Sequence, residues 1–86
     1  MNRLLHTSQQ LAVLIKTARK ARQLTQAEVA ARLGVSQNRF SELERDASGL
    51  TVERLLVLAP LLGLDILVQK SDARPAGVSE PAAADW

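Results

Sequence analysis

The stretch of residues 24–44, LTQAEVAARLGVSQNRFSELE, constrains the fold of this chain more than any other feature. Thr25 and Glu28 have the spacing of a capping box, in which each side chain satisfies a backbone N–H at the start of a helix. Gly34 suits the left-handed position that ends a helix. Ser36 can cap a second helix two residues later. The stretch therefore predicts two short helices joined by a turn too tight for them to lie antiparallel, which is a helix-turn-helix.

Helical periodicity predicts one helix before this stretch and one after it. The first helix is expected to begin near Thr7 or Ser8, and the last helix to begin after Thr51. Their expected buried faces are Leu11, Leu14, Ile15 and Ala18 in the first helix and Val52, Leu55, Leu56 and Ala59 in the last. Proline inside a helix removes a backbone hydrogen bond, so Pro60 is expected to kink the last helix or stop it at Ala59.

The chain resembles the lambda-repressor-like (Xre/Cro) DNA-binding family from about residue 11 to residue 64. The matching residues are Leu24-Thr25-Gln26, Ala30, Leu33-Gly34-Val35-Ser36-Gln37, Leu43 and Glu44. The resemblance implies an all-α domain of four to five helices. It also implies a pair between Arg19 and Glu44 that ties the first helix to the end of the third, and we expect this pair to be structural rather than a DNA contact.

The helix that begins at Ser36 carries the side chains expected to read DNA. Amides such as those of Gln37 and Asn38 can bond bidentately to the adenine edge in the major groove, and Arg39 can reach guanine or phosphate. The resemblance implies that Gln26 contacts the DNA backbone and braces Gln37. The full set of predicted DNA contacts is Gln26, Ser36, Gln37, Asn38, Arg39, Ser41, Arg45 and Ser48.

Two residues of this helix have alternative interpretations. Phe40 is expected to pack in the core together with Leu43, and its insertion between bases is the less favoured alternative. Glu42 either accepts from cytosine or points to solvent, and the sequence does not decide between the two.

Charge and composition fit a polyanionic partner. Residues 1–45 hold eight Lys/Arg against three acids, a net +5, whereas residues 46–86 are net −3. The chain has no cysteine, one histidine, no nucleophile–base set and no phosphate-binding glycine loop, so we expect neither enzyme activity nor a cofactor or metal site. With no membrane-length apolar run or secretory signal, a cytoplasmic, nucleoid-associated protein is expected.

Residues 64–70, LDILVQK, change to strand-like composition. A lone strand leaves its backbone groups unpaired, so we expect it to pair with the same strand of a second copy. The residues predicted to join the two copies are Leu64, Ile66, Leu67 and Val68. A continued helix packed on the core is the alternative. The expected organisation is a DNA-binding domain over 1–63, a dimerisation strand over 64–70 and a disordered tail over 71–86.

The strand, the tail and the final Trp86 are similar to those of HipB-like antitoxins. That resemblance implies a homodimeric repressor that binds a palindromic operator and restrains a HipA-type serine/threonine kinase toxin, with Trp86 docking on the toxin. Tryptophan is a frequent interface anchor, although an exposed chance residue is also possible here. The alternatives are a stand-alone Xre-family repressor without a toxin and a pure protein-interaction module.

Overall fold

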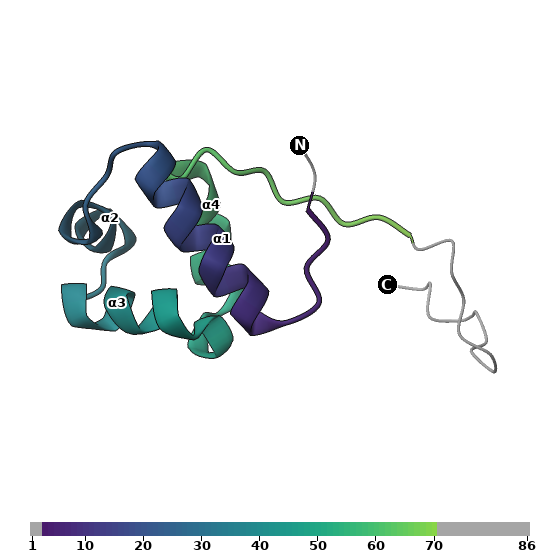
Figure 1. The fold of residues 1–86 in the computed structure, drawn as a ribbon, viewed down its shortest axis with the longest axis horizontal. Helices are drawn as coiled ribbons and strands as arrows, with labels where there is room; N and C mark the ends of the chain where they lie inside the picture. The colour runs from purple at the N-terminus through teal and green to yellow at the C-terminus, as the bar shows by residue number, and fades with distance from the viewer. Residues whose placement is uncertain (1–2, 71–86) are drawn as a thin grey trace.

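Four α-helices and one short 3-10 helix make up the part of the chain that the computed structural model describes, residues 3–70 (Figure 1). The helices are α1 (Ser8–Ala21), α2 (Gln26–Leu33), α3 (Gln37–Arg45), η1 (Ala47–Gly49) and α4 (Val52–Leu61). The all-α prediction is confirmed. The short helix η1 is not predicted from the sequence, because residues 45–49 have turn composition and no helical periodicity.

Hydroxyl side chains begin all four α-helices. Thr25 Oγ1 accepts from the Glu28 backbone N–H at 3.0 Å, and the Glu28 carboxylate accepts from the Thr25 N–H at 2.8 Å, which completes the predicted capping box. Ser36 and Thr51 cap α3 and α4 as expected. Thr7 caps α1.

The turn between α2 and α3 depends on a left-handed residue. Gly34 has a φ of 84°, a conformation that costs other L-residues free energy. Its N–H and that of Val35 both donate to the Ala30 carbonyl oxygen, at 2.9 and 3.0 Å. Ser36 follows at once as the cap of α3, so the two helices cannot fold back on each other.

Side chains from all four α-helices meet in one core. Its largest fully buried members are Phe40, Ile15, Leu43, Leu58 and Val29. In α1 the most buried residues are Ala12, Ile15 and Arg19, and the predicted Leu11, Leu14 and Ala18 are half-buried beside them. Phe40 packs inside, so the alternative in which it inserts between bases is wrong.

The predicted buried face of α4 is partly wrong. Val52 is 71% exposed and Leu56 is also exposed, whereas the structure buries Leu58 and Ala59. Seven of the ten α4 residues are aliphatic, so periodicity could not fix which of them face inward. Packing against the core therefore determines which side of α4 is buried.

α4 also continues further than predicted. It passes through Pro60 to Leu61, and the Leu62 N–H closes the last turn onto the carbonyls of Leu58 and Ala59. Proline at this position removes only one hydrogen bond near the helix end, and the burial of Leu58, Ala59 and Leu62 outweighs that loss.

Residues 64–70 follow α4 as an extended segment. The alternative of a continued helix is wrong, and within residues 3–70 the single chain contains no β-strand. A strand that pairs only with a second copy lacks its hydrogen bonds in one chain. Leu64 packs half-buried on its own core, while Leu67 and Val68 are exposed. The tail over 71–86 and Trp86 lie outside the described residues.

Candidate nucleic-acid interface

α3 lies along an edge of the helical body, and its two sides differ in character (Figure 1). The inner side carries Phe40, Leu43 and Glu44, all buried. The predicted reading residues Gln37 and Asn38 are exposed on the outer side. Ser41, expected to face outward with them, is half-buried. The outer side of α3 therefore presents amides to solvent that make no contribution to the core.

A hydrogen-bonded ion pair fastens α3 to the rest of the domain. Arg19 Nε donates to Glu44 Oε2 at 2.5 Å, and Arg19 Nη2 donates to Glu44 Oε1 at 3.1 Å. Arg19 Nη1 also donates to the carbonyl of Leu24 at 2.9 Å, just before α2. Both charged side chains are buried, so each depends on the other for compensation. The pair orients α3 relative to α1.

Gln26 differs from the expectation drawn from the family resemblance. Its Nε2 donates to Glu44 Oε1 at 2.9 Å and does not brace Gln37. The Glu44 carboxylate is buried and has lone pairs left after binding Arg19, so it is the favoured acceptor for a nearby amide. Gln26 therefore joins the first residue of α2 to the inner side of α3.

Arg39 and Glu42 interact on the outer side of α3. Arg39 Nη1 donates to Glu42 Oε1 at 3.3 Å, and Arg39 Nη2 donates to the carbonyl of Gly49 at 3.3 Å. Glu42 is exposed and, in the described chain, is the carboxylate partner of Arg39. Ser36 Oγ, another predicted contact, accepts from the Arg39 backbone N–H at 3.0 Å as the α3 cap.

The loop after α3 is ordered by an acidic cap. Asp46 Oδ1 accepts from the Ser48 backbone N–H at 2.9 Å, and this bond holds the pKa of Asp46 below its ordinary value. The Ser8 hydroxyl donates to the same oxygen at 3.5 Å. Of the predicted contacts in this region, Arg45 is the last residue of α3 and Ser48 lies in η1, and both are exposed.

A contact that the sequence interpretation missed lies behind α2. Arg54 Nη1 on α4 donates to the carbonyl oxygen of Leu33 at 2.9 Å. No signal in the sequence pairs these two positions, because they lie in different helices and Arg54 reads as an ordinary surface residue.

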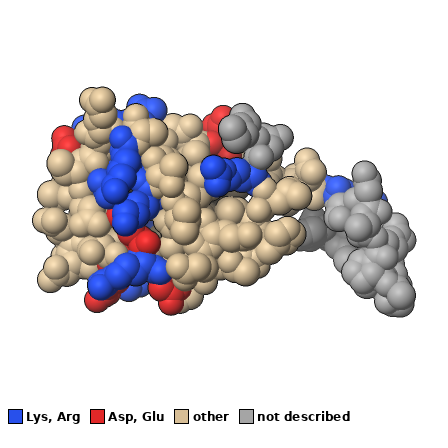
Figure 2. All heavy atoms as spheres, viewed as in Figure 1, with Lys and Arg blue, Asp and Glu red and all other residues tan. Residues whose placement is uncertain are grey.

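Basic side chains gather in a band across the face that carries α1 and α3, with acidic side chains beside them (Figure 2). This distribution agrees with the positive net charge of residues 1–45. A positive surface of this kind attracts a polyanion over several ångströms and lowers the cost of close approach.

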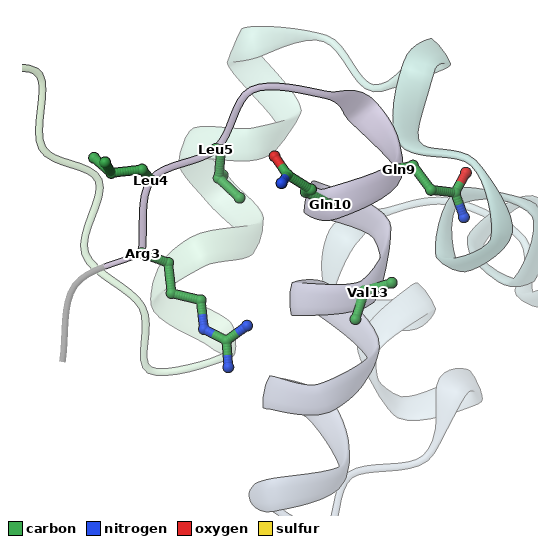
Figure 3. A pocket seen from close by; sticks show the side chains of 6 residues that line it. All are labelled: Arg3, Leu4, Leu5, Gln9, Gln10 and Val13. Atoms are coloured by element: carbon green, nitrogen blue, oxygen red, sulfur yellow. The ribbon is translucent and has the colours of Figure 1, made fainter.

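A shallow hollow lies between the N-terminal residues and α1 (Figure 3). Its lining side chains are Arg3, Leu4, Leu5, Gln9, Gln10 and Val13. None of the predicted DNA contacts lines it. Within residues 3–70 no cluster of three or more His, Asp or Glu side chains could hold a metal ion, and no helix is long and apolar enough to cross a membrane.

Comparison with known families decides the classification. The family model described as a helix-turn-helix domain matches residues 10–69. The chain belongs to the helix-turn-helix domain family. No curated protein sequence matches it.

Solved structures similar in fold to this chain include chains of two HipB complexes and a restriction-modification controller protein. A chain of the HipB–O4 20mer complex is 22% identical, with a TM-score of 0.70 over 83% of this chain and 100% of that chain. A chain of the HipA–HipB–O2–O3 complex is also 22% identical, with a TM-score of 0.71 over 83% of this chain and 100% of that chain. The restriction-modification controller protein C.Esp1396I is 22% identical, with a TM-score of 0.62 over 67% of this chain and 75% of that chain.

The same helix-turn-helix fold also occurs within an enzyme chain. Hydroxypropylphosphonic acid epoxidase from S. wedmorenis, solved in complex with fosfomycin, is 23% identical, with a TM-score of 0.65. The match covers 83% of this chain but 46% of the epoxidase chain. At these identities the likeness describes the fold, and the function has to be argued from the side chains of α3.

Proposed function

We propose that this protein is a sequence-specific DNA-binding transcriptional repressor in which α3 enters the major groove. One observation carries the proposal: α3 is fixed from its inner side by Phe40, Leu43 and the Glu44 ion pair, and it presents Gln37 and Asn38 outward. Side-chain amides match the donor and acceptor pattern of adenine. Neither side chain forms a hydrogen bond within residues 3–70, so both amides are available to a base edge. We therefore propose DNA binding rather than catalysis, at the nucleoid in the cytoplasm.

Five of the other predicted contacts, on α3 or close to it, are proposed to hold the phosphate backbone, and Arg39 to reach either a guanine edge or a phosphate. The five are Gln26, Ser36, Ser41, Arg45 and Ser48. Backbone contacts set the register of a protein on DNA, whereas base contacts carry the sequence information. The band of basic side chains in Figure 2 supports this arrangement.

We propose that the repressor acts as a homodimer joined through residues 64–70. Val68 is 94% exposed and Leu67 is also exposed, so both large apolar side chains remain uncovered in one chain. Antiparallel pairing with a second copy would cover them and would satisfy the free backbone groups. Two α3 helices would then lie about 34 Å apart, one turn of a palindromic operator.

We further propose that the repressor is the antitoxin of a type II, HipA/HipB-like operon. The support is the fold likeness, which extends over the whole of the HipB chain. In this proposal Trp86 docks on a HipA-type serine/threonine kinase. The second candidate, a stand-alone Xre-family repressor, is favoured by the likeness to C.Esp1396I and gives Trp86 no role.

A selection experiment tests the DNA-binding proposal. The full chain is incubated with a random 30-base-pair duplex library, and bound duplexes are sequenced over several rounds. We expect a palindromic sequence to be enriched, and Gln37→Ala to lose about 1–3 kcal/mol of discrimination at one base position. Gln9→Ala, at an exposed glutamine of α1 outside the predicted DNA contacts, is the matched control. Equal losses on selected and random duplexes would show that Gln37 does not read bases.

A separate experiment distinguishes the antitoxin from the stand-alone repressor. If the neighbouring gene encodes a kinase, that kinase is incubated with the full chain, with the chain cut after Lys70, and with Trp86→Ala. The antitoxin proposal expects both altered chains to bind the selected duplex normally and the kinase weakly. Absence of a neighbouring kinase gene, or equal kinase binding by all three chains, would favour the stand-alone repressor.

A further inference from the structure

The guanidinium of Arg39 is tethered at two points rather than free in solvent. It donates to the Glu42 carboxylate and to the Gly49 carbonyl, each at 3.3 Å. The Arg39 and Glu42 side chains are still 45% and 57% exposed. An arginine has five N–H donors, so these two bonds leave three for a ligand. The tethered side chain therefore keeps the capacity to bind DNA and favours one orientation.

Gly49 provides the space for this tether. A Cβ atom at position 49 would lie 2.6 Å from Arg39 Nη2, closer than nonbonded atoms approach. Glycine is therefore the residue that lets the guanidinium lie against the backbone of η1 and reach its carbonyl. Any larger residue displaces the guanidinium without changing its charge.

A tethered arginine and a free one differ in what they recognise. A free, flexible cation binds whichever phosphate lies within reach, which increases affinity for DNA of any sequence. An oriented guanidinium with a compensating carboxylate gains less from phosphate alone, and it gains most where a guanine edge accepts the donors that remain.

We propose that Glu42 is a positioning residue that determines specificity: with the Gly49 carbonyl it holds the Arg39 guanidinium beside η1 and limits binding to unselected DNA. The inference rests on the proposed DNA-binding function and names a residue whose role the sequence left open. Glu42 itself makes no base contact in this assignment. Its effect on DNA passes through Arg39.

The test measures binding of full-length variants to two duplexes, the selected sequence and the random library, at several salt concentrations. We expect Glu42→Gln to raise affinity for the random duplex about three- to tenfold and to steepen the salt dependence by about 0.9 of a log unit per log unit of salt, as one phosphate contact is gained. The ratio of selected to random affinity should fall at least about fivefold. Gly49→Ala should lower the same ratio with the net charge unchanged.

Two controls separate positioning from net charge and from structural damage. Glu53→Gln changes the net charge equally, but from an exposed residue of α4, and it should leave the ratio within about twofold. In an Arg39→Gln background, Glu42→Gln should lower the ratio no further, because the tethered group is gone.

Each outcome decides the inference. Equal effects of Glu42→Gln and Glu53→Gln would overturn it in favour of net charge alone. An equal affinity loss on both duplexes, together with a lower melting temperature, would overturn it in favour of a structural role. If the wild-type chain enriches no sequence, the proposed function fails and the inference fails with it. If enrichment succeeds and the ratio does not change in Glu42→Gln, only the inference fails.

Discussion

Arg54 on α4 holds the last carbonyl of α2: its Nη1 lies 2.9 Å from the carbonyl oxygen of Leu33. The final carbonyls of a helix have no partner within the helix, so this bond satisfies a group that would otherwise depend on water. The same Nη1 would lie 3.9 Å from a Cβ atom at Gly34. α4 therefore supports the segment from which the turn to α3 begins.

Removing this guanidinium should weaken the domain measurably. Arg54→Met keeps much of the side-chain length but leaves the Leu33 carbonyl without its charged donor, so we expect the free energy of unfolding to fall by about 1–2 kcal/mol. Urea denaturation followed by circular dichroism measures the change. Lys16→Met, exposed on α1 and without a side-chain hydrogen bond in the described residues, should stay within about 0.5 kcal/mol of wild type. Equal losses in both variants would contradict the assignment.

The turn residue Gly34 should tolerate substitution poorly for a conformational reason alone. There is space for a methyl group, since the nearest atom would be 3.9 Å away, but φ is 84°. We expect Gly34→Ala to cost about 1–2 kcal/mol of unfolding free energy. Gly34→Asn should cost less, because asparagine enters the left-handed region more readily. The same urea titration measures both, and no loss in the alanine variant would show that the turn relaxes.

The Arg19–Glu44 pair should show strong non-additivity. Glu44→Leu leaves the buried Arg19 guanidinium and the Gln26 amide without their acceptor, and we expect a loss of about 3–5 kcal/mol. Arg19→Met combined with Glu44→Leu removes both charges and should lose less than Glu44→Leu alone. Denaturation of the two single variants and the double variant gives the coupling. An additive result would mean that the pair acts as two independent residues.

Acid should destabilise the domain partly through two exposed caps. The Thr25 backbone N–H lowers the pKa of Glu28, and the Ser48 backbone N–H lowers that of Asp46. Their stabilisation is therefore complete above the ordinary carboxyl pKa values, about 4.3 for Glu and 3.9 for Asp, and is lost as pH falls through the lower folded-state values. Melting temperatures from pH 7 to pH 2 should fall less in Glu28→Gln/Asp46→Asn than in wild type. Parallel curves would exclude these groups as contributors.

The extended segment should control the proposed dimer. Leu67→Lys with Val68→Lys places two charges where we expect apolar side chains to meet a second copy, so the molar mass from light scattering should fall to that of the monomer. The melting temperature should then no longer depend on protein concentration. Leu4→Lys, another exposed leucine, is the control. An unchanged mass in the double lysine variant would assign dimerisation to a different surface.

Local signals in the sequence predicted the elements well because their causes are local. The hydroxyl caps at Thr25, Ser36 and Thr51 and the left-handed Gly34 each act on a backbone within four residues. The inward face of α4 could not be predicted in the same way. In an almost continuous aliphatic run, no helical periodicity marks one side as the buried one. Only packing against the core decides that Leu58 faces inward and Val52 does not.

The candidate site likewise has features that local sequence signals predict and features that only the packing of the helices determines. Exposure of Gln37 and Asn38 follows from helical spacing once α3 is capped at Ser36. The bonds of Gln26 to Glu44 and of Arg39 to the Gly49 carbonyl do not, because they join residues 18 and 10 positions apart and depend on how the helices pack. The family resemblance predicts the Arg19–Glu44 pair. Helical periodicity alone does not distinguish these two charged residues from the other charged residues of the chain.

Because α3 is held in place by its inner side, its outer side can be changed to engineer binding to new DNA sequences. Positions 37 and 38 can be randomised in a library without disturbing the residues that fasten the helix from within. Selection on a duplex of any chosen sequence would then test DNA recognition separately from folding. Most members of the library should be expressed as folded protein.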